Sequence, residues 1–151
     1  MLGKMVSLFA VLTLSSCTDP KYVQNTLPQQ LESIRISEKP NATFPESKNG
    51  VLLTWEKMPT SDEFGSAIIK TGRVNTPDGT LTLEDMNGDL AVVLWMPSMG
   101  HGSSPVKVER LGEGIYRASQ IFFSMPGDWE IRIQRKNGDQ VLDQAIIAIR
   151  I

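Results

Sequence analysis

Short β-prone runs separated by turn residues follow one another along most of this sequence. From Val51 onward they are "VLLTWEK", "SAIIK", "TLTLED", "DLAVVLWM", "PVKVERL", "GIYRASQIFF", "DWEIRIQRK" and "QVLDQAIIAIRI". Pro, Gly, Asp and Asn lie between the runs, and no long window has a convincing helical period. Seven or eight short strands in roughly 100 residues predict an all-β fold, an immunoglobulin-like β-sandwich of two sheets.

One run predicts a central strand that ends at a defined residue. Along "DLAVVLWM" the side chains alternate between two faces, and both are apolar: Leu90, Val92, Leu94 and Met96 share one face, and Ala91, Val93 and Trp95 share the other. This pattern favours a strand that is buried on both sides. Pro97 has no N–H to donate to a ladder, so we expect the strand to end at Met96.

Two kinds of local signal support the sandwich. Asn87-Gly88 and Asn137-Gly138 are typical of type I′ hairpin turns, in which both central residues have positive φ. The segment "LGEGIYRA" resembles the tyrosine corner of immunoglobulin-type domains, so we expect the Tyr116 hydroxyl to bond to backbone upstream. Ala118 would then occupy the position at which antibody domains carry a cysteine.

The first residues have the pattern of an export signal. In residues 1–16, Lys4 precedes the uncharged run "MVSLFAVLTL", which is too short to span a bilayer as a mature helix. The ending "LSSC" resembles a bacterial lipobox, in which Cys17 becomes the first residue and carries a lipid. The alternative is an ordinary cleaved signal with an incidental cysteine. We expect a protein anchored to a membrane through Cys17, in the bacterial cell envelope and facing the periplasm or the cell exterior.

Composition divides the remainder into a tether and a domain. Residues 17–49 contain four prolines and many Ser, Asn and Gln residues, which predicts a lipidated cysteine followed by a flexible tether. Residues 50–151 hold the strand-like runs and are predicted to form the sandwich. Cys17 is the only cysteine, so the domain has no thiol to form a disulfide and must be stabilised by its core.

Charge and residue usage argue against two function classes. The formal net charge is −2 and the chain has no Lys/Arg cluster, so nucleic acid is not expected as a partner. An enzyme is not expected either, because the chain has one histidine and the domain has no thiol. "GHGSS" does not match the nucleophile elbow of serine hydrolases, since Gly102 stands where that motif requires serine.

The segment "WMPSMGHGSS" gathers residues that are suited to a soft metal ion. It places Met96, Met99 and His101 around a Pro/Gly bend, and "FFSMPGDW" places Met125 in a similar context at the end of another strand. Thioethers favour Cu(I), and imidazole binds copper in either oxidation state, whereas zinc usually recruits cysteine, further histidines or carboxylates. Copper, as Cu(I), is therefore the expected cofactor. Met96 and Met125 could instead be core residues.

The three blocks around these residues resemble the YtkA-like domain family. Over Leu83–Ile133 they are "MPSMGH" at the bend, "GIY" in a hairpin and "MPGDW" at the end of another strand. The resemblance implies a small exported or membrane-attached β-sandwich, and several members are associated with copper handling or oxidase maturation. It therefore implies a copper-binding role for Met96, Met99, His101 and Met125, with a copper donor or acceptor protein as partner. The alternative function is a metal-free immunoglobulin-like interaction module of the envelope.

Overall fold

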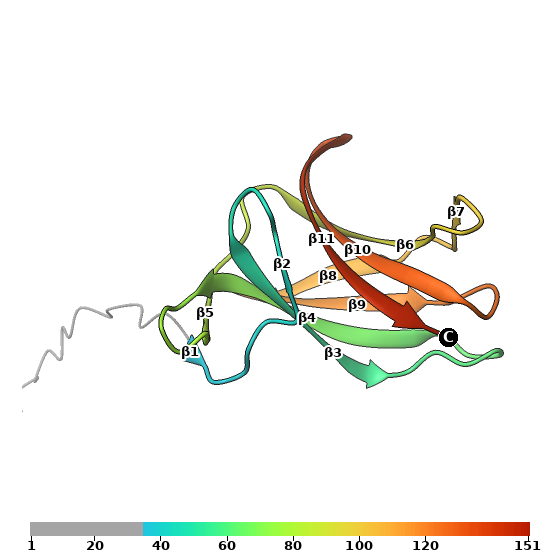
Figure 1. Cartoon of the computed structure of the whole chain (residues 1–151), viewed down its shortest axis with the longest axis horizontal. Helices are drawn as coiled ribbons and strands as arrows, with labels where there is room; N and C mark the ends of the chain where they lie inside the picture. The colour runs from blue at the N-terminus through green and yellow to red at the C-terminus, as the bar shows by residue number, and fades with distance from the viewer. Residues whose placement is uncertain (1–34) are drawn as a thin grey trace, which may run out of the picture. The chain divides into compact units, whose positions relative to one another are not determined.

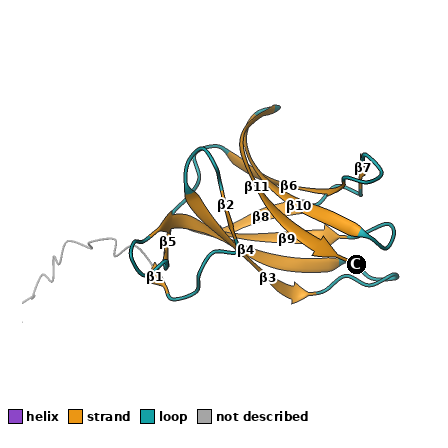
Figure 2. Ribbon diagram, in the orientation of Figure 1, coloured by secondary structure: helices purple, strands orange, loops and turns teal. Residues whose placement is uncertain are grey.

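The computed structural model describes residues 35–151, so the predicted signal segment, Cys17 and the first part of the predicted tether lie outside the described residues. The described part contains eleven strands and no helix, and hence no helix that could cross a membrane (Figures 1 and 2). The strands are β1 (Arg35–Ile36), β2 (Ala42–Thr43), β3 (Asn49–Lys57), β4 (Gly65–Val74), β5 (Leu81–Leu83), β6 (Asp89–Met96), β7 (His101–Gly102), β8 (Lys107–Gly112), β9 (Ile115–Ile121), β10 (Asp128–Asn137) and β11 (Gln140–Arg150).

The strands form two antiparallel sheets, which confirms the predicted all-β sandwich. One sheet has the order β1-β5-β4-β3-β2, with β9 beside β4 and β8 beside β9; the other has the order β11-β10-β6-β7. Seven strands have six or more residues, and the other four have two or three. The seven long strands are ordered β3-β4-β9-β8 in one sheet and β6-β10-β11 in the other, which is the order of a constant-type immunoglobulin sandwich.

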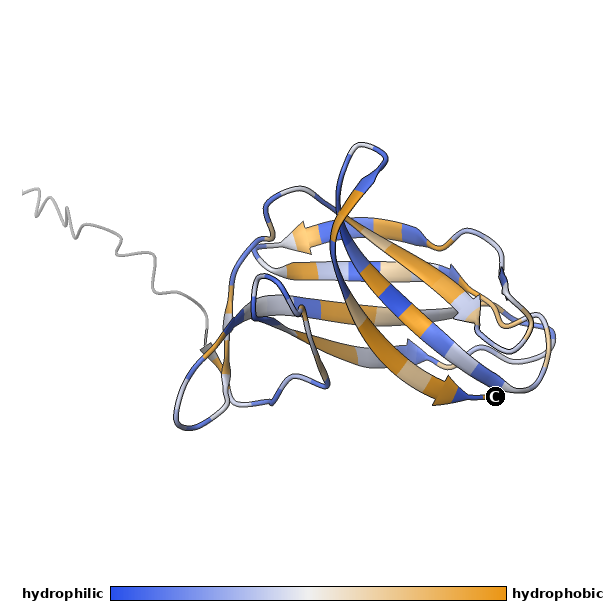
Figure 3. Cartoon of the chain, turned by 45° about the horizontal axis from the view of Figure 1, so that its top comes forward, coloured by the Kyte–Doolittle hydropathy of each residue, from blue (hydrophilic) through white to orange (hydrophobic). Residues whose placement is uncertain are grey.

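The core lies between the two sheets and is built by alternation along each strand. Figure 3 shows apolar and polar residues alternating along the strands. Trp129, Ile131 and Ile133 of β10 point inward and are almost fully buried. They pack with residues from the other strands and loops: Phe44, Val51, Leu53, Ala67, Ile69, Met86, Val92, Leu94, Met96, Tyr116, Ala118, Ile121, Phe123 and Ala145. This apolar contact holds the described domain together.

Strand β6 ends at Met96, as Pro97 predicts, but it is not buried on both sides. Val92, Leu94 and Met96 are buried in the core, whereas Ala91, Val93 and Trp95 are only half-buried on the outer face of the sheet. Nothing described covers that face as a third layer. The Arg132 guanidinium lies 4.9 Å from the centre of the Trp95 ring, so a cationic side chain shields part of this surface.

The packed domain begins earlier than the expected boundary at residue 50. Residues 35–49 were assigned to the tether, but β1 pairs with β5, and β2 pairs with β3. Phe44 is fully buried in the core. Two-residue strands give only a weak signal in the sequence, and the prolines around them favour the interpretation as a tether.

Only one of the two predicted hairpin turns is a hairpin. β10 and β11 form a hairpin in which Asn137 pairs with Gln140, so the two loop residues are Gly138 and Asp139. Of these two loop residues, only Gly138 has a positive φ, at 57°. This fits a type II′ turn and not the expected type I′ turn. Asn87-Gly88 connects β5 in one sheet with β6 in the other, so it forms a crossover. An Asn-Gly dipeptide therefore predicts a local turn but does not indicate which strands the turn connects.

A buried carboxylate attaches the segment before β3 to β11. Asp143 of β11 is 4% exposed, and its two oxygens accept the backbone N–H groups of Glu46 at 3.3 Å and Ser47 at 2.8 Å. Burial is the largest single influence and raises the pKa of Asp143, but the N–H groups of Ser47, Glu46 and Gln144 together hold that pKa below its usual range. The charged form of Asp143 is therefore the one that stabilises the fold.

We expect Asp143→Asn to lower the free energy of unfolding at pH 7 by about 1.5–3 kcal/mol, since a charged acceptor of buried N–H groups is lost. A depressed folded-state pKa gives stability that is present above the unfolded-state pKa of about 3.9 and is lost as the pH falls through the folded-state pKa. The deficit of the variant should therefore shrink below about pH 4. Urea unfolding at pH 7 and pH 3 measures this, with the exposed Asp62→Asn as control. An equal deficit at both pH values would contradict the assignment.

Candidate functional site

The bend after β6 turns back on itself as a short hairpin. The carbonyl oxygen of Met96 accepts the N–H groups of Met99 at 3.2 Å and Gly100 at 3.0 Å. The chain then pairs back as β7, with His101 opposite Met96 and Gly102 opposite Trp95. The lone histidine is therefore held on a two-residue strand, in register with the end of β6, and not in a free loop.

Trp129 brings the connection between β9 and β10 to the same end of the sandwich. Its indole N–H donates to the carbonyl oxygen of Met125 at 3.0 Å. The edge-to-face contact between the Trp129 and His101 rings has centres 6.2 Å apart and planes at 75°. A hydrogen bond from the Ser103 hydroxyl to the Phe122 carbonyl also links the two loops. In Figure 1, β7 and the β9–β10 connection lie at one end, and β1 and β5 lie at the other.

The four sequence-predicted residues differ in their access to solvent. Met96 is 2% exposed, whereas Met99 is 60% exposed and Met125 is 36% exposed. A Cβ added to Gly127, which has a φ of 143°, would lie 2.8 Å from the Met96 methyl carbon, so the backbone at Gly127 closes directly over that side chain. Met96 is thus a core residue of this end. Met99, His101 and Met125 are the accessible soft donors, and we call this region, with Trp129, the Met/His end.

His101 is oriented so that one ring nitrogen remains available. Its Nδ1 lies 3.0 Å from the carbonyl oxygen of Gly102. A carbonyl oxygen can only accept, so Nδ1 carries the proton in that hydrogen bond. The neutral ring then has its lone pair on Nε2, which is the usual arrangement of a metal-binding histidine with a backbone partner.

The Met/His end is surrounded by aromatic side chains. The rings of Phe123 and Trp129 make an edge contact with centres 5.4 Å apart, and those of Phe64 and Phe122 make one at 5.7 Å. A hollow of about 220 Å³ adjoins Met125. It is lined by Pro59, Thr60, Ser61, Phe122, Phe123, Ser124, Met125, Pro126 and Ile151. Of the three accessible donors, Met125 therefore lies beside a mostly apolar hollow.

The described residues 35–151 contain no group of three or more His, Cys, Asp or Glu side chains that could hold a metal ion. The soft donors on the two loops of the Met/His end are two thioethers and one imidazole, ligand types that suit Cu(I) and do not suit calcium or magnesium.

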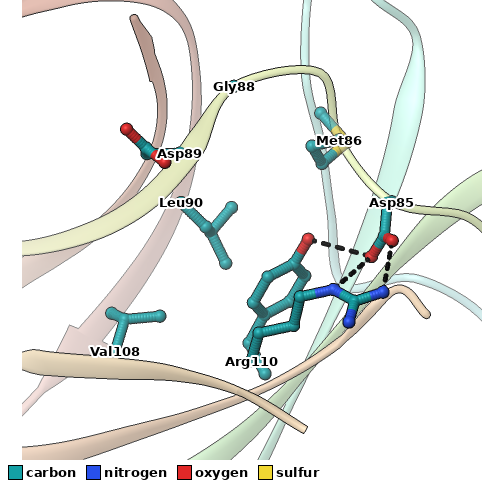
Figure 4. A pocket seen from close by; sticks show the side chains of 8 residues that line it. Asp85, Met86, Gly88, Asp89, Leu90, Val108 and Arg110 are labelled. Carbon is teal, nitrogen blue, oxygen red and sulfur yellow. Dashed lines mark hydrogen bonds and ion pairs between the residues drawn. The ribbon is translucent and has the colours of Figure 1, made fainter. Parts of the chain in front are cut away.

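A second hollow, of about 320 Å³, lies away from the Met/His end and contains Tyr116 (Figure 4). The Tyr116 hydroxyl bonds to the Asp85 carboxylate at 3.3 Å. Tyr116 lies on β9, the fifth long strand, whereas the tyrosine corner belongs to the sixth. The expected tyrosine corner is therefore wrong in its strand, although the hydroxyl interacts with the backbone of Met86 upstream as well as with Asp85. Ala118 is a fully buried core residue of the same strand. The motif "GIY" identified a tyrosine with an anchored hydroxyl but not the carboxylate that binds it.

Asp85 forms the centre of a structural network that the sequence did not reveal. Its carboxylate accepts a fork of bonds from Arg110 and the N–H of Gly114 at 2.9 Å, besides the Tyr116 hydroxyl. The Arg110 guanidinium is the largest cause that holds the pKa of Asp85 below its usual range, and the Gly114 N–H acts in the same direction. Burial, with a smaller effect of the Asp85 charge, raises the pKa of Tyr116. The network ties the β5–β6 connection to the β8–β9 hairpin.

The comparison with protein families finds a match to part of this domain. Residues 63–134 match the family model described as YtkA-like. The segment is YtkA-like. This confirms the predicted resemblance, and the matched YtkA-like segment contains β4 to β9 complete and most of β10, and therefore both loops of the Met/His end. No curated protein and no solved structure gives a significant match to the chain.

Two substitutions of Met96 separate a core role from a ligand role. Met96→Leu keeps the volume and should change the free energy of unfolding by less than about 1.5 kcal/mol, whereas Met96→Ala should lower it by about 2–5 kcal/mol because it leaves a cavity under Gly127. Chemical denaturation measures both values. A Met96→Ala variant as stable as the parent would show that Met96 does not support the core.

Proposed function

We propose that this domain binds Cu(I) at the Met/His end through His101, Met99 and Met125, and that it holds or passes on copper in the bacterial cell envelope. The observation that carries the proposal is the convergence on Trp129: its indole N–H binds the Met125 carbonyl and its ring contacts His101. One buried side chain thus positions two loops that each contribute a soft donor.

The chemistry of the donors supports copper as the cargo. Thioether sulfur carries no proton at any ordinary pH and binds Cu(I) well, and the Nε2 of His101 would supply a nitrogen ligand. Met96 is left out of the proposed set because its side chain is enclosed in the core. The apolar rings of Phe123 and Trp129 would limit the access of water to a bound ion.

The envelope location rests on the sequence before the domain. The uncharged run after Lys4 and the "LSSC" ending support an anchor at Cys17, with a membrane as the first partner. The described residues 35–151 contain no cysteine, so the domain carries no free thiol that an oxidising exported location could modify. A copper donor or acceptor protein would be the second partner.

Competition for Cu(I) tests the proposed site. The purified chain, titrated with Cu(I) in the presence of a coloured Cu(I) chelator, should withdraw about one equivalent of copper. Single changes Met99→Leu and Met125→Leu should each weaken binding roughly tenfold, and Met99→Ala with His101→Ala should abolish competition, since each removes a ligand bond. Met86→Leu, which removes a buried thioether of the core, is the matched control. Competition by the double variant equal to that of the parent would end the proposal.

Lowering the pH from about 7.5 to about 5.5 should weaken copper binding, because protons and metal compete for the imidazole nitrogen. The thioethers do not titrate, so the affinity of His101→Ala should stay constant across this range. The same chelator titration, repeated across this range, measures the effect. A pH dependence that persists unchanged in His101→Ala would assign the titrating group elsewhere.

A metal-free docking role is the alternative, and the apolar surface beside Met125 favours it. Phe64, Met125 and Ile151 are exposed side chains near the hollow at this end. In this case Phe64→Asp should abolish the co-purification of an envelope partner, whereas Met99→Leu and His101→Ala should not affect it. Loss of the partner only in the metal-ligand variants would favour copper.

A further inference from the structure

Arg135 is a charged residue on the inward face of a core strand. Trp129, Ile131 and Ile133 of β10 fill the core, and Arg135 is the next residue on that face. Six residues of extended strand separate it from Trp129, which places it about 20 Å from the Met/His end. An inward-facing guanidinium needs hydrogen-bond acceptors where water is scarce.

Within the described part of the chain, Arg135 is only partly satisfied. Its Nε is buried and has no hydrogen-bond partner there. One terminal nitrogen, Nη1, donates to the Asn87 carbonyl at a long 3.4 Å. Asp143 is the cross-strand neighbour of Arg135, but its oxygens accept the N–H groups of Ser47 and Glu46, and no carboxylate among residues 35–151 forms an ion pair with Arg135.

A hollow of about 230 Å³ adjoins this guanidinium. It is lined by Ser47, Asn49, Glu84, Asp85, Met86, Asn87 and Arg135. Both acidic residues of the lining have cationic partners of their own: Glu84 lies 3.6 Å from Arg73, and Asp85 is held by the fork of Arg110. Arg135 is therefore the charge of the lining that lacks a counter-charge.

We propose that this hollow binds a small oxyanion, a carboxylate or a phosphate, through Arg135. The guanidinium fork pairs with two oxygens of such a group, and the buried Nε gains its missing acceptor. The Asn49 amide is a further donor in the lining; its Nδ2 makes one bond of 3.4 Å, to the weak acceptor Met86 Sδ. The site involves none of the residues proposed for copper, so the two proposals stand independently.

Titration followed by amide NMR tests the site. The ¹⁵N-labelled chain is titrated separately with inorganic phosphate and with acetate, and sodium chloride keeps the ionic strength constant. Saturable shifts are expected at the Arg135 Nε–H and at the backbone amides of Ser47, Asn49 and Asn87. Saturation with phosphate alone assigns a phosphate ligand, and saturation with acetate alone assigns a carboxylate; both results support an oxyanion site. Shifts that do not saturate with either probe would overturn the proposal.

Matched arginine variants localise the binding. Arg135→Gln should weaken the affinity for the bound probe roughly tenfold or more, whereas Arg150→Gln removes the same charge from an exposed position on β11 and should leave it unchanged. Arg135→Lys keeps the charge without the fork and should bind more weakly than the parent, which provides a second test if the glutamine variant does not fold. Equal losses in Arg135→Gln and Arg150→Gln would indicate adventitious ion binding only and overturn the proposal.

Discussion

The buried indole of Trp129 determines how one end of this sandwich is assembled. The side chain is 1% exposed and belongs to the core, yet its N–H fixes the Met125 carbonyl and its ring edge contacts His101. A buried indole N–H needs an acceptor, and the β9–β10 connection supplies it. The position of the β9–β10 connection therefore depends on how Trp129 packs in the core. The geometry of any site that uses residues from both loops depends on the same packing.

Burial divides the methionines that lie close together in sequence. Met96 and Met99 are three residues apart, but the first lies under the backbone of Gly127 and the second projects into solvent. Proline and the turn at the Met96 carbonyl separate these environments, because the strand ends between the two residues. A thioether in the core fills space, and a thioether at a surface bend has no packing role, so only the second kind is free to bind a ligand.

Sequence alone predicted the features that depend on local pattern. Alternation gave the sandwich and the inward faces, and Pro97 gave the end of β6. Three features could not be predicted because they depend on distant partners. Phe44 reaches the core from a proline-rich segment, the Asp85 carboxylate accepts the hydroxyl of Tyr116, and Trp129 joins His101 to Met125. No spacing in the sequence encodes these contacts, since the fold brings together residues that are far apart along the chain.

Strand β10 sets the chemical difference between the two ends of the core. Its inward face passes from Trp129 through Ile131 and Ile133 to Arg135, so the interior changes from aromatic to cationic along a single strand. The sheets can enclose the aromatic end because its polar atoms are paired locally, as the Trp129 N–H shows. At the other end Asp143 satisfies backbone N–H groups and Arg110 satisfies Asp85, which leaves the Arg135 Nε without an acceptor. A buried N–H without an acceptor destabilises the fold unless a ligand in the adjacent hollow accepts its hydrogen bond. The arginine on the inward face of β10 therefore links the stability of the domain to the binding of the proposed oxyanion.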